Sequence, residues 1–330
     1  MCIFYRHIDE FLEGKSSPCY CQSQNQTKDF EERNNGISDT LFGRKNVFRE
    51  MGFLGNTPRK STSNDLGKTR WSDCGCESCV SWMNNGGDQK LHVVVKNPSK
   101  VFPELVGSKY RLFAVDLLGF GSSPKPRECL YTLNDHVEMV EKSVIREFDL
   151  NSFHLVAHSM GCIIALALAA KYPNNLKSIT LVAPPYFLSS EEEDASEIAL
   201  KRLAYKSVWP PLLFGSAFMT WKLSFLVIDL FRHTHHSAWH TMHNVICGGA
   251  KMMDPCLETL RQVQARVTVV QGSRDQVVPV ECGNNIKVKV PDAEVKIIIG
   301  ANHTTVIIGR EKQFAADLEL ILDSANDAKG

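Results

Sequence analysis

The chain has 330 residues, of which 43% are hydrophobic and 22% are charged. This length suits one large domain with a tail or two modest domains, and the composition is that of a globular protein with a sizeable core. Lys plus Arg and Asp plus Glu each total 37, so the charge balance gives no indication of a nucleic-acid partner. No apolar run approaches the ~20 residues of a membrane-spanning helix, and the first residues lack a signal-peptide core. Taken as it stands, the chain is expected in the cytoplasm.

The N-terminal part differs in composition from the rest. Residues 22 to about 70 are rich in Asn, Ser, Lys, Arg, Gly and Asp and have few periodic apolar positions. Such a composition is typical of a poorly ordered arm, which we place at residues 1–70. Organised sequence begins near Trp71, so the folded domain is expected over residues 71–330.

Cysteines are concentrated near the N-terminus. Of eleven in the chain, six lie in the first 79 residues. Cys74, Cys76 and Cys79 are spaced like three zinc ligands, but no further cysteine pair or nearby His completes a site. Free or disulfide-bonded thiols are therefore favoured over metal at these positions, and the sequence leaves the choice between them open.

From residue 91 onward, short apolar strands alternate with helical patterns. Leu133 to Phe148 has apolar residues at helical spacing, with Thr132 as the expected N-cap. A second helix, from Cys162 to Ala170, is apolar throughout. Strands are expected at 91–96, 111–116, 153–157, 178–183, 267–271 and 294–299, and a closing helix at 310–322. This alternation predicts an α/β fold with a mostly parallel sheet, helices on both faces and ligands at the carboxyl ends of the strands.

Ser159 lies at the turn between an apolar strand and an apolar helix. Ala157 and Gly161, two residues before and after it, are small enough to let strand and helix approach each other. This context is typical of the G-x-S-x-G nucleophile elbow, with Ala in place of the first Gly. Alone, it also fits a serine in a tight turn that has no chemical role.

Two later loops supply partners for this serine. Asp275 follows the strand ending at Gln271, and His303 follows the last strand. A nucleophilic serine needs a base, and the base needs a carboxylate to orient it. The order Ser, acid, His is that of the α/β-hydrolase fold, so we predict a triad of Ser159, Asp275 and His303.

Two other polar residues were weighed for this site. His158 precedes the predicted nucleophile, and its side chain is expected to point away from Ser159 and to pack or shape the pocket. Asp116 precedes a glycine-rich turn and is expected to be structural. An Asp at the elbow would favour a dehalogenase or an epoxide hydrolase, and Ser159 disfavours both.

The section at about 185–256 is where this fold inserts a helical cap. Its apolar run at 221–231 is expected to be a cap helix. His236, His240 and His243 follow i, i+4, i+7 spacing, so a helix would align them as metal ligands are aligned. The cap setting favours packing or polar lining instead, and neither a metal nor a cofactor is expected.

From Trp71 onward, the chain resembles the plant BODYGUARD-type α/β-hydrolases, described as probable lysophospholipases involved in cuticle formation. The residues that carry the resemblance are Trp71–Trp82, Ala114–Gly121, Ser123–Pro126, Phe153–Ser159, Val208–Pro211, His233–His243, Val278–Cys282 and His303–Arg310. The resemblance implies that Ser159 is the nucleophile, Asp275 the acid and His303 the base. It also implies a fatty acyl ester as substrate and a location at the cell wall or outer surface of epidermal cells.

The resemblance breaks at one important place. Members of the family carry a strand ending in His-Gly before the strand at 111–116, and this chain has no His-Gly dipeptide. The loop after that strand would donate one oxyanion-hole N–H, the other coming from Met160. We expect Leu91–Lys96 to shift into the missing central position, where the following Pro98 has no N–H to donate. Losing one such donor typically costs on the order of 10²- to 10³-fold in rate.

The cap also looks shorter than the family's, and the hydrophobic segment that the family usually has upstream of His7 is absent. Together with the missing strand, these losses indicate a truncated splice form or an imperfect gene model. Three functions therefore remain open: an ester hydrolase, an acyltransferase with the same triad, and a catalytically impaired protein that binds a ligand. Head group, acyl length and oligomeric state are not readable from the sequence.

Overall fold

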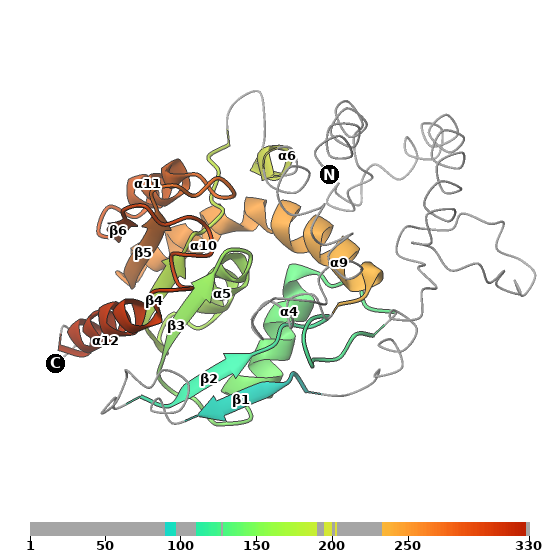
Figure 1. Ribbon diagram of the computed structural model, residues 1–330. Helices are drawn as coiled ribbons and strands as arrows, with labels where there is room; N and C mark the ends of the chain where they lie inside the picture. Colours follow the sequence, from blue (N-terminus) through green and yellow to red (C-terminus); the bar gives the residue numbers. More distant parts are fainter. Residues whose placement is uncertain are drawn as a thin grey trace, which may run out of the picture.

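The computed structural model describes residues 90–96, 110–126, 128–189, 195–199, 202 and 233–327. The predicted arm at 1–70, the cysteines at 74, 76 and 79, and the apolar run at 221–231 lie outside these residues. The division into arm, hydrolase domain and cap therefore stays a prediction. Figure 1 shows the arrangement of the described elements.

A parallel four-stranded sheet forms the centre of the molecule. Its strands pair in sequence order and are β3 (Phe153–His158), β4 (Leu176–Val182), β5 (Arg266–Gly272) and β6 (Glu294–Ile298). The mostly parallel sheet expected from the sequence is confirmed. The strand ends differ from the expected ones by one or two residues, as is usual for sequence-based boundaries.

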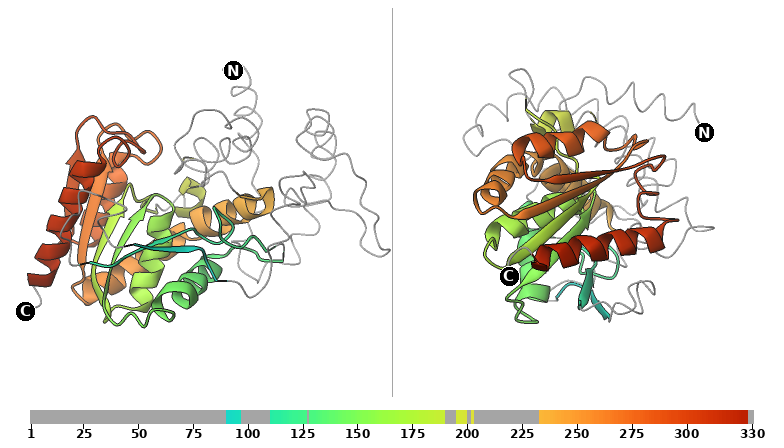
Figure 2. Two further views of the ribbon diagram at one scale, coloured as in Figure 1. Left: turned by 60° about the horizontal axis from the view of Figure 1, so that its bottom comes forward. Right: turned by 90° about the vertical axis from the view of Figure 1, so that its left-hand side faces the viewer.

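Helices cover both faces of this sheet, as predicted. α5 (Gly161–Lys171), α10 (Ala250–Gln262) and α11 (Val280–Lys289) pack on one face, and α12 (Glu311–Asp327) packs on the other (Figure 2). Neighbouring strand residues alternate between the two faces. Leu181 thus packs in the cluster under α5 and α10, whereas Val182 packs in the cluster under α12.

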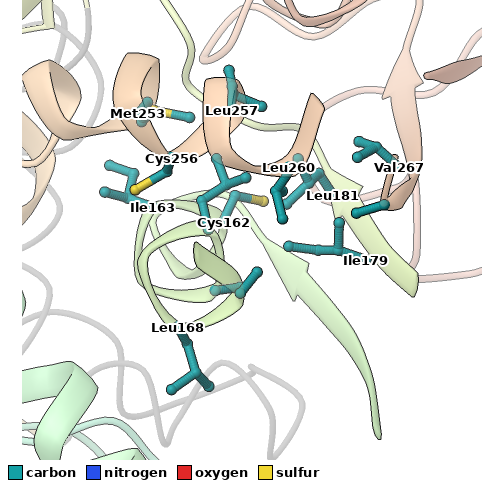
Figure 3. Packing of buried hydrophobic residues seen from close by; sticks show 14 of the residues in the cluster. Cys162, Ile163, Leu168, Ile179, Leu181, Met253, Cys256, Leu257, Leu260 and Val267 are labelled. Atoms are coloured by element: carbon teal, nitrogen blue, oxygen red, sulfur yellow. The ribbon is translucent and has the colours of Figure 1, made fainter. Parts of the chain in front are cut away.

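The larger core lies between α5, α10 and the sheet, as Figure 3 shows. Ile163 of α5, Leu257 and Leu260 of α10, and Leu181 of β4 are all at most 1% exposed. Each side chain of this size contributes about 1.5–3 kcal/mol when it is fully buried. Helix α5 is apolar around most of its circumference because strands, α10 and α4 (Leu133–Val140) all pack against it.

The remaining strands form a second, two-stranded sheet. β1 (Val93–Lys96) pairs antiparallel with β2 (Leu112–Val115), and within the described residues neither strand pairs with β3. The expectation that Leu91–Lys96 takes a central position in the parallel sheet is therefore wrong. The two residues before β1 make further contacts: the N–H of Leu91 donates to Ser143 Oγ at 2.8 Å, and the carbonyl oxygen of His92 accepts the N–H of Asp116, which directly follows β2, at 3.1 Å.

Helix α4 begins where the sequence predicts, because Thr132 caps it. The N–H of Asp135 donates to Thr132 Oγ1, and the N–H of Thr132 donates to Asp135 Oδ2, which satisfies two amides that the first turn leaves free. The helix continues as the π-helical segment η3 (Glu141–Ile145). Among the described helices, none is both long and apolar enough to cross a bilayer.

The described part of the predicted cap is rich in buried histidines. It comprises α6 (Ala195–Ile198), α9 (His235–Thr241) and η5 (Met242–Cys247). The His236 ring lies 4.4 Å from that of His240 and 5.6 Å from that of Tyr131, which in turn lies 6.4 Å from His136 of α4. Burial lowers the pKa of His136 to about 4. Burial, and then the nearby His240, lower the pKa of His243 to about 4.

These histidines predict acid-sensitive stability. Below about pH 6.5 the unfolded chain protonates His136 and His243, whereas the folded chain does so only near pH 4. The unfolded state thus binds more protons in this window, so the free energy of unfolding falls as the pH falls, by roughly 3 kcal/mol per histidine by pH 4. Urea unfolding at several pH values measures this loss.

The double variant His136→Gln, His243→Gln isolates the effect. Its free energy of unfolding should fall less steeply between pH 6.5 and 4 than that of the wild type, and each single variant should lie between the two. Equal slopes in the wild type and the double variant would contradict this account.

Candidate active site

Ser159 lies at a strained turn between β3 and α5. Its φ of 55° is in the left-handed region that side-chain-bearing residues rarely adopt. Two backbone hydrogen bonds hold it there. The N–H of Ser159 donates to the carbonyl oxygen of Val182 at 2.9 Å, and the N–H of Cys162 donates to the carbonyl oxygen of Ser159 at 2.9 Å. This geometry is that of a nucleophile elbow, which projects the hydroxyl from the carboxyl end of the strand.

The three side chains singled out from the sequence lie in one hydrogen-bonded chain. His303 Nε2 lies 2.9 Å from Ser159 Oγ, and His303 Nδ1 lies 2.8 Å from Asp275 Oδ2. The first distance allows the imidazole to accept the serine proton, and the second allows the carboxylate to accept the N–H of Nδ1. Their catalytic roles stay a prediction.

Asp275 is held by four donors in a dry environment. Its side chain has no exposed surface. Oδ1 accepts the backbone N–H groups of Val277 and Val278 at 2.9 and 2.8 Å, and Oδ2 accepts Gln271 Nε2 at 3.2 Å in addition to His303. A buried carboxylate needs such a set of donors, because leaving it without them would cost several kcal/mol.

Gln271 is a residue of this site that the sequence reasoning missed. Its Nε2 donates to the carbonyl oxygen of Val278 at 2.8 Å as well as to Asp275, which fixes the orientation of the amide. Gln271 itself is fully buried and lies in β5 among apolar residues. A glutamine inside a buried strand, four residues before the acid, was the signal that could have identified it, since a buried amide requires partners.

The loop that carries His303 is fixed by its neighbours. Asn302 forms a turn in which its Oδ1 accepts the N–H groups of Thr304 and Thr305 at 3.0 and 2.9 Å. The N–H of Arg274 donates to the carbonyl oxygen of Ala301 at 2.9 Å, which ties the Asp275 loop to the His303 loop. The two loops therefore hold each other in place.

Gly272 is needed for this approach. A Cβ at position 272 would lie 2.5 Å from the carbonyl oxygen of Ala301, which is closer than real contacts allow. Gly161 differs, because a Cβ there would lie 3.8 Å from the Cβ of Ala157, an ordinary contact. The close approach expected at the elbow therefore leaves room for one methyl group, whereas the approach at Gly272 leaves none.

Met160 precedes α5 as its N-cap residue. The N–H groups at a helix start have no partner within the helix and attract negative charge, so the Met160 amide fits the predicted oxyanion donor. Pro98, discussed above for the second donor, lies outside the described residues.

Asp116 and the cap histidines have other contacts. Asp116 Oδ2 accepts the N–H of Ser122 and lies 2.9 Å from His92 Nδ1, so it closes the glycine-rich turn. His236 Nε2 lies 2.8 Å from the carbonyl oxygen of Cys129, whereas His243 packs on Trp239 at 4.3 Å. The π-helical segment η5 begins at residue 242 and interrupts the helical spacing. In the described part of the chain, no three His, Cys, Asp or Glu side chains are placed to hold a metal ion.

Comparison with known proteins identifies the family. A model of the α/β-hydrolase fold matches residues 86–210. The chain is 45% identical to "Probable lysophospholipase BODYGUARD 4" of Arabidopsis thaliana, over 97% of this chain and 92% of that protein. The chain belongs to the BODYGUARD family of α/β-hydrolases. It is also 41% identical to BODYGUARD 5 of the same plant, over 96% of this chain and 90% of that protein.

A solved structure agrees with the fold. MGS-M2, an α/β-hydrolase enzyme from a deep-sea metagenome library, is 18% identical, with a TM-score of 0.52 over 73% of this chain and 96% of that one.

The alignment with BODYGUARD 4 runs over 392 positions, 62 more than the 330 residues of this chain. The BODYGUARD relative thus has internal residues with no counterpart here.

Gly272 and Gly161 give a prediction for the stability of this member of the BODYGUARD family. Gly272→Ala should lower the free energy of unfolding by about 1–3 kcal/mol, since the methyl group must displace the Ala301 backbone. Gly161→Ala, the matched control, should change it by less than about 1 kcal/mol, because the methyl group meets only an ordinary contact. Urea unfolding of both variants measures the difference, and equal destabilisation would contradict the close approach at Gly272.

Proposed function

We propose that this chain is a serine hydrolase that cleaves a fatty acyl ester, with a lysophospholipase-like substrate. The observation that carries the proposal is the hydrogen-bonded chain from Ser159 through His303 to Asp275. Membership of a family whose proteins are named probable lysophospholipases supports an ester hydrolase.

The proposed reaction has two halves. Ser159 Oγ attacks the acyl carbonyl carbon while His303 Nε2 takes the hydroxyl proton, and the resulting tetrahedral intermediate collapses to an acyl-serine. The leaving alcohol takes the proton back from His303. A water molecule then attacks the acyl-serine with the same base, which releases the fatty acid and restores the serine.

Asp275 has an electrostatic role in this scheme. Its carboxylate accepts the Nδ1–H of His303, keeps Nε2 free to accept the serine proton, and stabilises the imidazolium that forms. Burial strengthens this interaction, because few water dipoles screen it. The Met160 N–H is the proposed donor to the oxyanion.

An apolar cluster beside the elbow supports a fatty acyl substrate. The Met160 side chain packs against both the main core and a second cluster that includes Phe187, Ile198, Met242 and Ile246. That cluster joins the described part of the predicted cap to α10 and α11, through Ala250 and Cys282. An acyl chain entering beside Ser159 would meet hydrocarbon, which favours lipid over polar esters.

The finer parts of the proposal rest on family resemblance. They are a role in cuticle formation and a location at the cell wall.

An acyltransferase would use the same three residues, with an alcohol in place of water as the second acceptor. Product analysis with and without a glycerol-type acceptor separates the two reactions.

A ligand-binding protein with little activity is the alternative from another class. It is favoured by the separation of β2 from β3 in the described structure and by the residues that BODYGUARD 4 has in addition. The first of these observations concerns the side of the sheet from which the second oxyanion donor is expected.

A fluorophosphonate probe tests the proposal. The wild type should be labelled covalently, and Ser159→Ala should lose the label entirely because the probe bonds to the activated hydroxyl. Ser152→Ala, which changes an exposed serine at the opposite end of β3, is the matched control and should label like the wild type.

The companion variants test the base and the acid. His303→Ala and Asp275→Asn should reduce the labelling rate by at least about 10³-fold. A folded wild type that is not labelled, or labelling that survives Ser159→Ala, would overturn the hydrolase and leave the binding protein.

A further inference from the structure

We propose that His158 is a positioning residue, which holds the catalytic base in place through a hydrogen bond to the backbone of His303. The inference rests on the proposed function, because it gives His158 a role in the reaction of Ser159 and His303. His158 Nε2 lies 2.8 Å from the carbonyl oxygen of His303, which is within the normal range for an N–H···O hydrogen bond.

The hydrogen bond defines the state of the His158 ring. A carbonyl oxygen only accepts, so Nε2 of His158 carries the hydrogen and donates it. Burial, and next the nearby His303, lower the pKa of His158 to about 4. The ring is therefore neutral near pH 7, and its donating nitrogen is fixed by the acceptor.

Neutrality matters because the two rings are close. The His158 ring centre lies 4.8 Å from that of His303. A positive charge at this distance would oppose the imidazolium that His303 must form during the reaction. His158 can thus hold the loop without disfavouring the protonation of the base.

The carbonyl of His303 depends on this donor. Among the described backbone hydrogen bonds, none runs to the carbonyl oxygen of His303, although Asn302 and Thr304 on either side accept one or more. The Asn302 turn and the Arg274 hydrogen bond hold the loop before and after the base. The hydrogen bond from His158 holds the backbone of His303 itself.

The position of His158 in the fold explains its effect. It is the last residue of β3 and directly precedes Ser159, so its hydrogen bond joins the nucleophile's strand to the loop after β6. The Ser159 to His303 distance is then set by two connections, one through the reacting side chains and one through the His158 ring. The expectation that His158 only packs or shapes the pocket understates this contact.

Two substitutions of similar length separate donation from packing. His158→Gln places an amide N–H near the position of Nε2, whereas His158→Met has the same reach and no donor. Loss of the hydrogen bond from His158 should let His303 shift relative to Ser159, and a shift of about 1 Å typically costs about 10²-fold in rate.

The measurements are kcat and KM for a p-nitrophenyl acyl ester and the rate of fluorophosphonate labelling. For His158→Met we expect kcat and the labelling rate to fall on the order of 10- to 100-fold with little change in KM. His158→Gln should recover most of the loss. A merely structural role would affect both variants alike.

The outcomes distinguish this inference from the proposed function. If the wild type is unlabelled, the hydrolase itself fails. If the wild type is labelled and His158→Met reacts as fast as the wild type, or His158→Gln and His158→Met are equally slow, only the role of His158 is overturned. Should His158→Met fold poorly by circular dichroism, His158→Asn replaces it, since the shorter amide cannot reach the carbonyl. His158→Asn should then be slow, and a rate equal to that of His158→Gln would overturn the inference.

Discussion

The register of the parallel sheet determines the geometry of the site. His158 pairs with Val182, Val182 pairs with Val270, and Gly272 pairs with Ile298. The ends of β3, β5 and β6 therefore reach the same edge, and the loops that follow them carry Ser159, Asp275 and His303. Because adjacent strands are fixed by rows of backbone hydrogen bonds, the three side chains need only local turns to meet.

Those local turns carry strain that the core offsets. A side-chain-bearing residue in the left-handed region, as at Ser159, costs roughly 1–2 kcal/mol. Ala183, at the end of the neighbouring strand, has a φ of 49° and adds a similar cost. Ile163 and Leu166 of α5, both fully buried, each contribute about 1.5–3 kcal/mol. The helix that leaves the elbow thus stabilises the conformation that exposes the serine.

The sequence predicted the parts of the structure that depend on local pattern. Apolar strands and the order Ser159, Asp275, His303 identified the sheet and the residues that the structure brings together. The partner of β1 was not predictable, because a run of four strand residues specifies neither its neighbour nor its direction. The contact of His158 was missed for another reason: its donor and acceptor are 145 residues apart, and only the folded backbone brings them together. Gln271 contacts Asp275 only four residues away, so its burial in an apolar strand was a readable signal that was overlooked.

Holding the three side chains and stabilising the transition state involve different parts of the sheet. Ser159, Asp275 and His303 depend on β3 to β6, which form an unbroken parallel sheet. The second oxyanion donor is expected on the other side of β3, where Val156 is 43% exposed although β4 is buried along nearly its whole length. A hydrogen-bonded triad can therefore form without that side, since none of its contacts comes from β1 or β2. The rate would still depend on it, because one oxyanion donor typically accounts for on the order of 10²- to 10³-fold. Geometry at the nucleophile and rate are thus separable in this chain, because the contacts among Ser159, His303 and Asp275 come only from β3, β5, β6 and the loops that follow them.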